Sequence, residues 1–168
     1  GRASGVKNVA PFINELASRK PQLVMANINM ILPHLDSEPH YFRSAIVTAL
    51  GQIIGQTNRK EDDSDESKDD PSVSEFQTEE KEPNRVQIQS KTRDNLLDIL
   101  LERAHDTSSF TRSTVLKTWA GLVQDGLLPL NRLMPVTAIA IDRLKDKAVI
   151  VRRSSMQLLT LLLENNPF

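Results

Sequence analysis

The chain has 168 residues, of which 39% are hydrophobic, 26% are charged and only 4% are aromatic, and its formal net charge is −1. This hydrophobic fraction is enough to bury the core of about one domain, whereas few aromatic residues and only six glycines argue against an all-β sandwich or barrel. The absence of cysteine excludes disulfides, thiolate zinc sites and a cysteine nucleophile.

An all-α fold is therefore expected. The longest apolar stretch, Leu158 to Leu163, is shorter than the roughly 20 residues of a membrane helix, so we predict no membrane span. The chain begins at Gly1 without a methionine or a charged-then-apolar leader. We therefore expect it to be a piece of a longer protein.

The first elements are predicted from apolar residues at helical spacing. A short leading helix is expected over 8–19, followed over 21–56 by two antiparallel helices that a tight turn joins. The stripes that predict this pair are Val24, Ile28, Ile31 and Leu35 in its first helix, and Phe42, Ile46, Ala49 and Ile53 in its second.

A polar segment over 59–85 separates this pair from the rest. It contains eleven acidic and five basic residues, and Phe76 and Val73 are its only large apolar side chains. Such a composition buries too little apolar surface to offset the entropy of ordering, so we predict a disordered acidic loop. The remainder of the chain then carries a net charge of +5.

Two further helix pairs are predicted over 86–124 and 130–165. Pro129 and Pro135 lie near the start of the second, where Pro135 either opens its helix or kinks it. Their turns are alike: Asp106 is followed six residues later by Arg112, and Asp146 is followed six residues later by Arg152. A looser copy runs from Asp36 to Arg43. Helix pairs that repeat every 40 residues are typical of an α-solenoid of HEAT repeats, about three of them here.

The turn residues have a structural interpretation. Asp36 or Ser37, Asp106 and Asp146 lie where an N-cap acceptor is wanted for the following helix. We expect Asp106, Arg112, Asp146 and Arg152 to hold neighbouring repeats together rather than to act in binding or catalysis. The leucine-rich last helix has the composition of a helix that another repeat covers.

No catalytic or cofactor motif is recognisable, so we predict no enzyme activity, cofactor or small-molecule substrate. His34, His40 and His105 lie near turns without a second ligand at helical spacing, and solvent-facing histidines are expected rather than a metal site. Gly51 and Gly55 have the small-xxx-small spacing of closely packed helices, which we attribute to repeat packing. Aromatic platforms for single-stranded nucleic acid are not expected.

Positive charge is concentrated between Arg112 and Arg153, a stretch that contains eight basic and only three acidic residues. Candidate contacts to a DNA backbone cluster around the Asp146 turn: Arg143, Lys145, Lys147 and Arg153. The competing interpretation is that Arg143 and Lys145 complement a helix dipole and that Arg152 belongs to the repeat's own ion pair.

The acidic loop also has two interpretations. It is either a solvated insertion of small entropic cost or a regulatory segment. Ser67 and Ser72 each have an acidic residue three positions later, the pattern of acidophilic kinase sites, and phosphorylation there would compete with DNA for the basic edge.

The amino-acid sequences of three segments, 9–17, 93–116 and 140–168, resemble the HEAT region of the condensin complex subunit 1 family. The resemblance covers nearly all of the chain except 59–85. It implies a non-catalytic scaffold in condensin that binds the kleisin subunit, an SMC ATPase head and double-stranded DNA without sequence specificity. It also implies a role in mitotic chromosome condensation, in the nucleus and on chromosomes, and in the cytoplasm for part of the cell cycle. The alternative is a HEAT adaptor for nuclear transport or a phosphatase.

Overall fold

The computed structural model describes residues 2–57 and 90–165, and within these ranges it contains helices and turns but no strand. The expected all-α, solenoid-like fold is confirmed. The predicted acidic loop over 59–85 lies outside the described residues. No helix in the described ranges has the length and apolarity needed to cross a bilayer.

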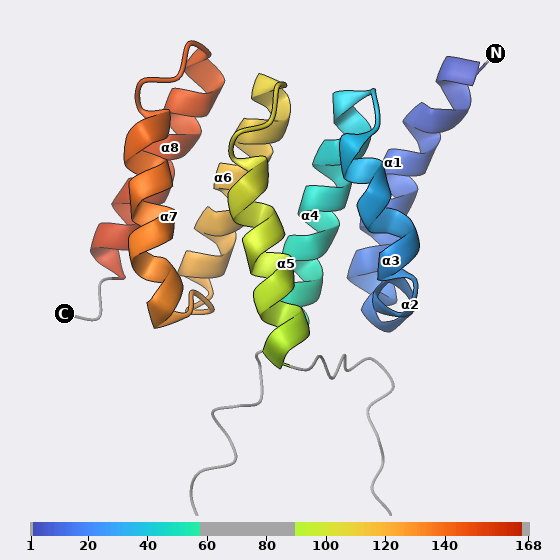
Figure 1. Cartoon of the computed structure of the whole chain (residues 1–168), viewed down its shortest axis with the longest axis horizontal. Helices are drawn as coiled ribbons and strands as arrows, with labels where there is room; N and C mark the ends of the chain where they lie inside the picture. Colours follow the sequence, from blue (N-terminus) through green and yellow to red (C-terminus); the bar gives the residue numbers. More distant parts are fainter. Residues whose placement is uncertain (1, 58–89, 166–168) are drawn as a thin grey trace, which may run out of the picture.

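The helices lie in two layers (Figure 1). The first layer holds four helices that run in the same direction and pack in order along the solenoid: α1 (Arg2–Arg19), α4 (His40–Thr57), α6 (Ser109–Gln124) and α8 (Val149–Glu164). The second layer runs the opposite way and holds α5 (Ser90–Arg103), α7 (Leu130–Arg143) and a broken segment near α1. Each predicted antiparallel pair thus places one helix in each layer.

The broken segment differs from the single helix expected there. It consists of α2 (Pro21–Ala26), α3 (Ile28–Ile31) and the 3₁₀ helix η1 (Leu32–Asp36). Asn27 interrupts the first helix because its side-chain amide donates to the Leu23 carbonyl at 2.8 Å, in competition with the backbone. Pro33 lacks the N–H that would continue an α-helix. The apolar stripe is correct, since Val24, Ile28 and Leu35 are buried, but backbone chemistry breaks the helix that carries it.

The two prolines near α7 have separate roles. Pro129 is the N-cap residue and Pro135 lies inside the helix, so Pro135 does not open it. The core between the layers includes Ile46, Leu97 and Trp119, each at most 1% exposed. Burying side chains of this size contributes roughly 1.5–3 kcal/mol each relative to exposure.

Helices α4 and α6 approach closely at Gly51. A Cβ atom on Gly51 would lie 2.4 Å from the Thr118 Cγ2 methyl, whereas a Cβ on Gly55 would lie 3.9 Å from Leu127 Cδ1. The first distance is a clash and the second is ordinary contact. The close-packing interpretation of this glycine pair therefore applies at Gly51, and Gly55 has room for a side chain.

We predict that Gly51→Ala destabilises the chain by about 1–3 kcal/mol, because overpacking outweighs the gain in helix propensity. Gly55→Ala is the control and should be neutral or stabilising. Urea unfolding would measure both, and Thr118→Ser, which removes the clashing methyl, should rescue Gly51→Ala. Equal effects of the two alanines would contradict the proposed close approach.

Candidate functional site

A buried salt bridge joins α4 to the turn between α5 and α6. Arg43 donates from Nε to Asp106 Oδ2 at 2.9 Å and from Nη2 to Asp106 Oδ1 at 2.8 Å. The two side chains are 9% and 3% exposed, respectively. Asp106 Oδ1 also accepts the Ser108 backbone N–H at 2.8 Å. The planar guanidinium matches the carboxylate, so the contact fixes orientation as well as distance.

The same contact recurs between α6 and the turn before α8. Arg112 donates from Nε to Asp146 Oδ2 at 2.7 Å and from Nη2 to Asp146 Oδ1 at 2.9 Å, while Asp146 Oδ1 accepts the Ala148 N–H at 2.9 Å. We call the Arg43–Asp106 and Arg112–Asp146 contacts the turn bridges. Each one connects a first-layer helix to the turn of the next helix pair.

The arginines also bind their own turns. In three places an arginine Nη1 donates at 2.8 Å to the backbone carbonyl six residues earlier: Arg43 to Ser37, Arg112 to Asp106, and Arg152 to Asp146. One edge of the guanidinium therefore closes its own turn, and the other edge is presented to the next one. The six-residue spacing in the sequence reflects this local bond.

Arg43 was not among the residues predicted to join repeats, although the spacing contained the signal. The looser copy was aligned on Asp36, which is 79% exposed and pairs with Arg103 Nη1 at 3.0 Å. The feature that this turn shares with the other two is the carbonyl of Ser37, six residues before Arg43. Asp36 and Arg43 are seven residues apart rather than six, so the aspartate of this turn is shifted by one position. The arginine keeps the same spacing to the turn carbonyl that it binds.

The prediction that the turn aspartates are N-caps is wrong. Ser108 and Ala148 are the N-cap residues of α6 and α8, and neither makes a side-chain cap bond. Asp106 and Asp146 lie two residues earlier and accept the N–H of the cap residue itself. Their carboxylates are placed for the neighbouring arginine, which is a tertiary partner that local capping rules do not include.

The turn bridges lower the pKa of both aspartates. Burial alone would raise the pKa of Asp106, but the hydrogen bonds from Arg43 and the Ser108 N–H outweigh it, and the pKa lies below its ordinary value. At Asp146 the hydrogen bond from Arg112 is the largest cause of the lowered pKa, and burial opposes it. Both carboxylates are charged at neutral pH.

The four predicted DNA contacts are not equivalent. Arg143 donates to Asp142 and lies 3.4 Å from Asp146 Oδ2, so it is already committed to carboxylates. Lys145 and Lys147 are exposed on the turn between α7 and α8. Arg153 is exposed on α8, beside the arginine that binds the turn. Within the described ranges, Lys145, Lys147 and Arg153 have no salt bridge. Ser67 and Ser72 lie outside those ranges.

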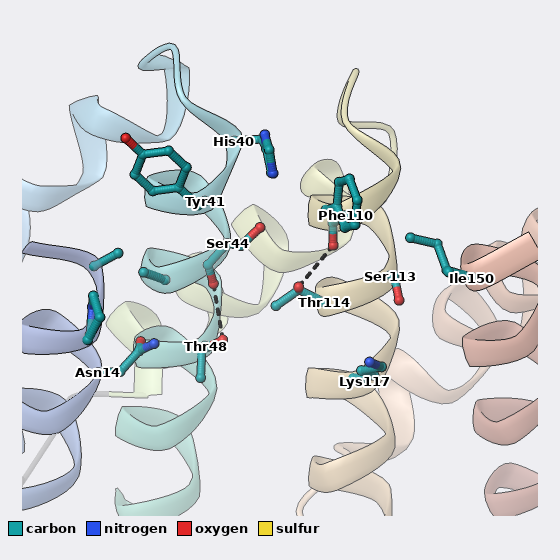
Figure 2. A pocket seen from close by; sticks show the side chains of 13 residues that line it. Asn14, His40, Tyr41, Ser44, Thr48, Phe110, Ser113, Thr114, Lys117 and Ile150 are labelled. Carbon is teal, nitrogen blue, oxygen red and sulfur yellow. Dashed lines mark hydrogen bonds between the residues drawn. The ribbon is translucent and has the colours of Figure 1, made fainter. Parts of the chain in front are cut away.

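A groove of about 600 Å³ crosses the first layer (Figure 2). Polar side chains from three helices line it: Asn14 of α1, Ser44 and Thr48 of α4, and Ser113, Thr114 and Lys117 of α6. The hydroxyls of Thr48 and Thr114 donate to carbonyls of their own helices, which leaves oxygen lone pairs to accept from a ligand. The groove can therefore hydrogen-bond an extended backbone.

An aromatic pair stands at the end of this groove nearest the turns. His40 and Phe110 stack with ring centroids 5.0 Å apart at 21°, and Phe110 is 59% exposed. The expectation of solvent-facing histidines holds for His34 and His105 but not for His40, which is half-buried. These two residues are 70 positions apart in the sequence, so no local pattern indicated that their rings would stack. The described residues contain no group of three or more potential metal ligands.

Comparison with known proteins identifies similar chains. The chain is 38% identical over 165 residues to condensin complex subunit 1 of Mus musculus and 32% identical to condensin-1 complex subunit CAP-D2 of Arabidopsis thaliana. Condensin complex subunit 1 of Saccharomyces cerevisiae is 23% identical. Each match covers 98% of this chain, which spans only about a tenth of these relatives' lengths. No family model matches.

We predict that Asp106→Asn lowers the free energy of unfolding at neutral pH by on the order of 3 kcal/mol, because it breaks a buried pair and leaves Arg43 without its carboxylate. Asp98→Asn is the control, since Asp98 pairs with Arg132 at an exposed site and surface pairs contribute little. Urea unfolding of both variants would measure the difference. Equal losses would show that burial of the turn bridge is unimportant.

The same variant should change the pH dependence of stability. A carboxylate whose folded pKa is lowered contributes stability that is complete above the unfolded pKa, near 3.8, and is lost as the pH falls through the folded pKa. The wild type should therefore lose stability below about pH 5 more steeply than Asp106→Asn. Thermal unfolding across this range would test it, and parallel curves would argue against the lowered pKa.

Proposed function

Because this chain is a homologous segment of the condensin complex subunit 1 family, we propose that it serves as a non-catalytic scaffold within condensin. Similarity over nearly the whole chain to subunits of that name is the observation that carries the proposal. The fold supports it, since buried ionic groups such as Arg112 and Asp146 are engaged in helix packing. On the same similarity we propose a role on chromosomes in the nucleus.

The groove is our proposed site for a segment of the kleisin subunit. An extended peptide could bind with its backbone along the hydroxyls of Ser44, Thr48 and Thr114, with an apolar side chain against Phe110. Lys117 is exposed in the same groove and would favour an acidic residue in the peptide. Hydrogen bonds to the peptide backbone would supply affinity. The side chains of Phe110 and Lys117 would supply the preference for particular peptide sequences. An SMC head would then contact another surface of the same subunit.

Lys145 and Lys147 are our proposed contacts to double-stranded DNA. Both are exposed at one turn, and neither forms a salt bridge within the described residues, although the hydrogen bond from Arg143 and, to a smaller extent, the charge of Lys145 lower the pKa of the Asp142 carboxyl. Contacts of this kind bind phosphates without reading bases. Arg143 is a weaker candidate because Asp142 and Asp146 already neutralise it. The adaptor alternative has no comparable support, because the similar proteins bear condensin names.

We predict that Phe110→Ala combined with Lys117→Glu reduces recovery of kleisin and SMC subunits when the full-length protein is used as bait. The lost ring and the reversed charge would both weaken a peptide in the groove. Phe12→Ala combined with Lys20→Glu is a matched control, since Phe12 is 62% exposed and neither residue lines the groove. Unchanged recovery with the groove variant would move the kleisin site elsewhere, whereas failure of the wild type would argue against condensin membership.

We predict that Lys145→Glu with Lys147→Glu weakens binding of the chain to duplex DNA and lowers the slope of log affinity against log salt by about 2, because each phosphate contact contributes roughly 0.9. Lys20→Glu with Lys91→Glu changes the net charge equally at other exposed positions and serves as the control. A salt titration followed by fluorescence anisotropy measures both slopes. The same loss in both variants would mean that net charge, rather than this turn, attracts DNA.

A further inference from the structure

Three large side chains stand in a row at the end of the groove nearest the turns: Tyr41, Phe110 and Ile150 (Figure 2). Each lies two residues before an arginine whose Nη1 donates at 2.8 Å to the carbonyl six residues before that arginine. This bond fixes the first turn of α4, α6 and α8 in the same way. The three side chains therefore occupy equivalent places on neighbouring parallel helices, and the row advances by one helix at each step.

The row is accessible, and its central member is held in place. Phe110 is 59% exposed and Ile150 is 37% exposed, while Tyr41 is half-buried. The His40 ring stacks on Phe110 with centroids 5.0 Å apart and meets the Tyr41 ring edge-on at 5.9 Å. Because His40 joins the two aromatic members of the row, they need little reordering when a ligand binds.

The step of the row restricts the conformation of a peptide that contacts all three side chains. Packed helices lie roughly 8–10 Å apart, so equivalent side chains on them are displaced by the same step. A polyproline II chain rises about 3.1 Å per residue with three residues per turn, so its side chains repeat on one face about every 9 Å. Side chains on one face of a β-strand are about 7 or 13 Å apart, and neither spacing matches the row.

An α-helix could also present side chains about 10 Å apart, at positions i and i+7, but its amide N–H groups are bonded within the helix. The groove offers acceptors, since the hydroxyls of Thr48 and Thr114 donate to their own helices and keep lone pairs free. A polyproline II chain has no internal hydrogen bonds, so its N–H groups can donate to these oxygens. The described residues that line the groove include the exposed Lys117 and no aspartate or glutamate, which favours an acidic ligand.

We infer that the groove selects an acidic peptide segment in the polyproline II conformation, with an apolar side chain at every third position to contact Tyr41, Phe110 and Ile150 in turn. Carboxylates at intervening positions pair with Lys117. The inference rests on the proposed function only in assigning a peptide to this groove. It adds the conformation and the sequence period that decide which peptide is bound.

The test measures binding of two fluorescein-labelled synthetic peptides to the full-length protein by fluorescence anisotropy. One peptide consists of three consecutive Leu-Glu-Pro triplets, and the other has the same composition with its leucines at alternate positions. The first should bind about tenfold more tightly, because only its leucines meet all three members of the row. Equal affinities, or no binding of either peptide at concentrations up to about 1 mM, would overturn the inference.

Alanine variants of the full-length protein test the individual contacts. Phe110→Ala should abolish the loss of affinity that follows replacement of the central leucine of the peptide by alanine, because both changes remove the same contact. Ile150→Ala should do the same for one terminal leucine. Val149→Ala is the matched control, since Val149 is 56% exposed beside Ile150 but does not line the groove. Losses that persist unchanged in both groove variants would overturn the inference.

The proposed function and this inference can fail separately. If the full-length protein recovers kleisin and SMC subunits while the two peptides bind equally, the proposed function stands and the inference is overturned. If the preference for the triplet peptide is found without recovery of those subunits, the inference is supported and the proposed function is contradicted. Peptide binding that is detected only after removal of residues 59–85 would identify that segment as the occupant and overturn the inference.

Discussion

The paired arginine and aspartate between successive turns is the interaction on which the arrangement depends. Each helix pair has its own apolar seam, but apolar packing alone is tolerant of sliding and rotation. A guanidinium held at one edge by its own turn and at the other by the next carboxylate permits one orientation only. Arg43 and Arg112 make this contact in sequence, so the first-layer helices stay parallel and in step. A buried ion pair is by itself weak evidence for stability. Here the two pairs account for the relative position of successive first-layer helices along their axes.

This constraint places the polar surfaces. Because α1, α4, α6 and α8 run side by side, side chains from helices distant in sequence line one groove, with Asn14, Ser44 and Lys117 among them. The turns gather at one edge of the solenoid (Figure 1). There, Arg143 pairs with Asp142 and Asp146, whereas Lys145 and Lys147 form no salt bridge within the described residues. The layer thus carries both the proposed peptide groove and the proposed phosphate-binding edge. Both surfaces are compatible with the condensin subunits that the chain resembles.

The clearest differences between expectation and structure have one cause. The turn aspartates were expected to cap helices, and Arg143 was expected to be available to DNA. Asp106 instead binds Arg43, which is 63 residues away in sequence, and Arg143 is held between two carboxylates. His40 and Phe110 likewise meet across 70 positions. Local rules assign a polar side chain to the nearest backbone group, whereas packing of repeats supplies partners that no short window contains.

Patterns along the chain were enough to predict the helical class and the similarity that carries the proposed function. The leading helix, the three helix pairs and the 40-residue step are predictions from the same patterns. These follow from apolar spacing, turn residues and local bonds such as Arg112 to the carbonyl six residues earlier. The folded arrangement was needed to show which carboxylate each arginine holds and that Gly51 rather than Gly55 is the point of close approach. It was also needed to show that side chains of α1, α4, α6 and α8 line one groove. Such features depend on distances between segments that are remote in the chain, and spacing along the chain does not encode those distances directly.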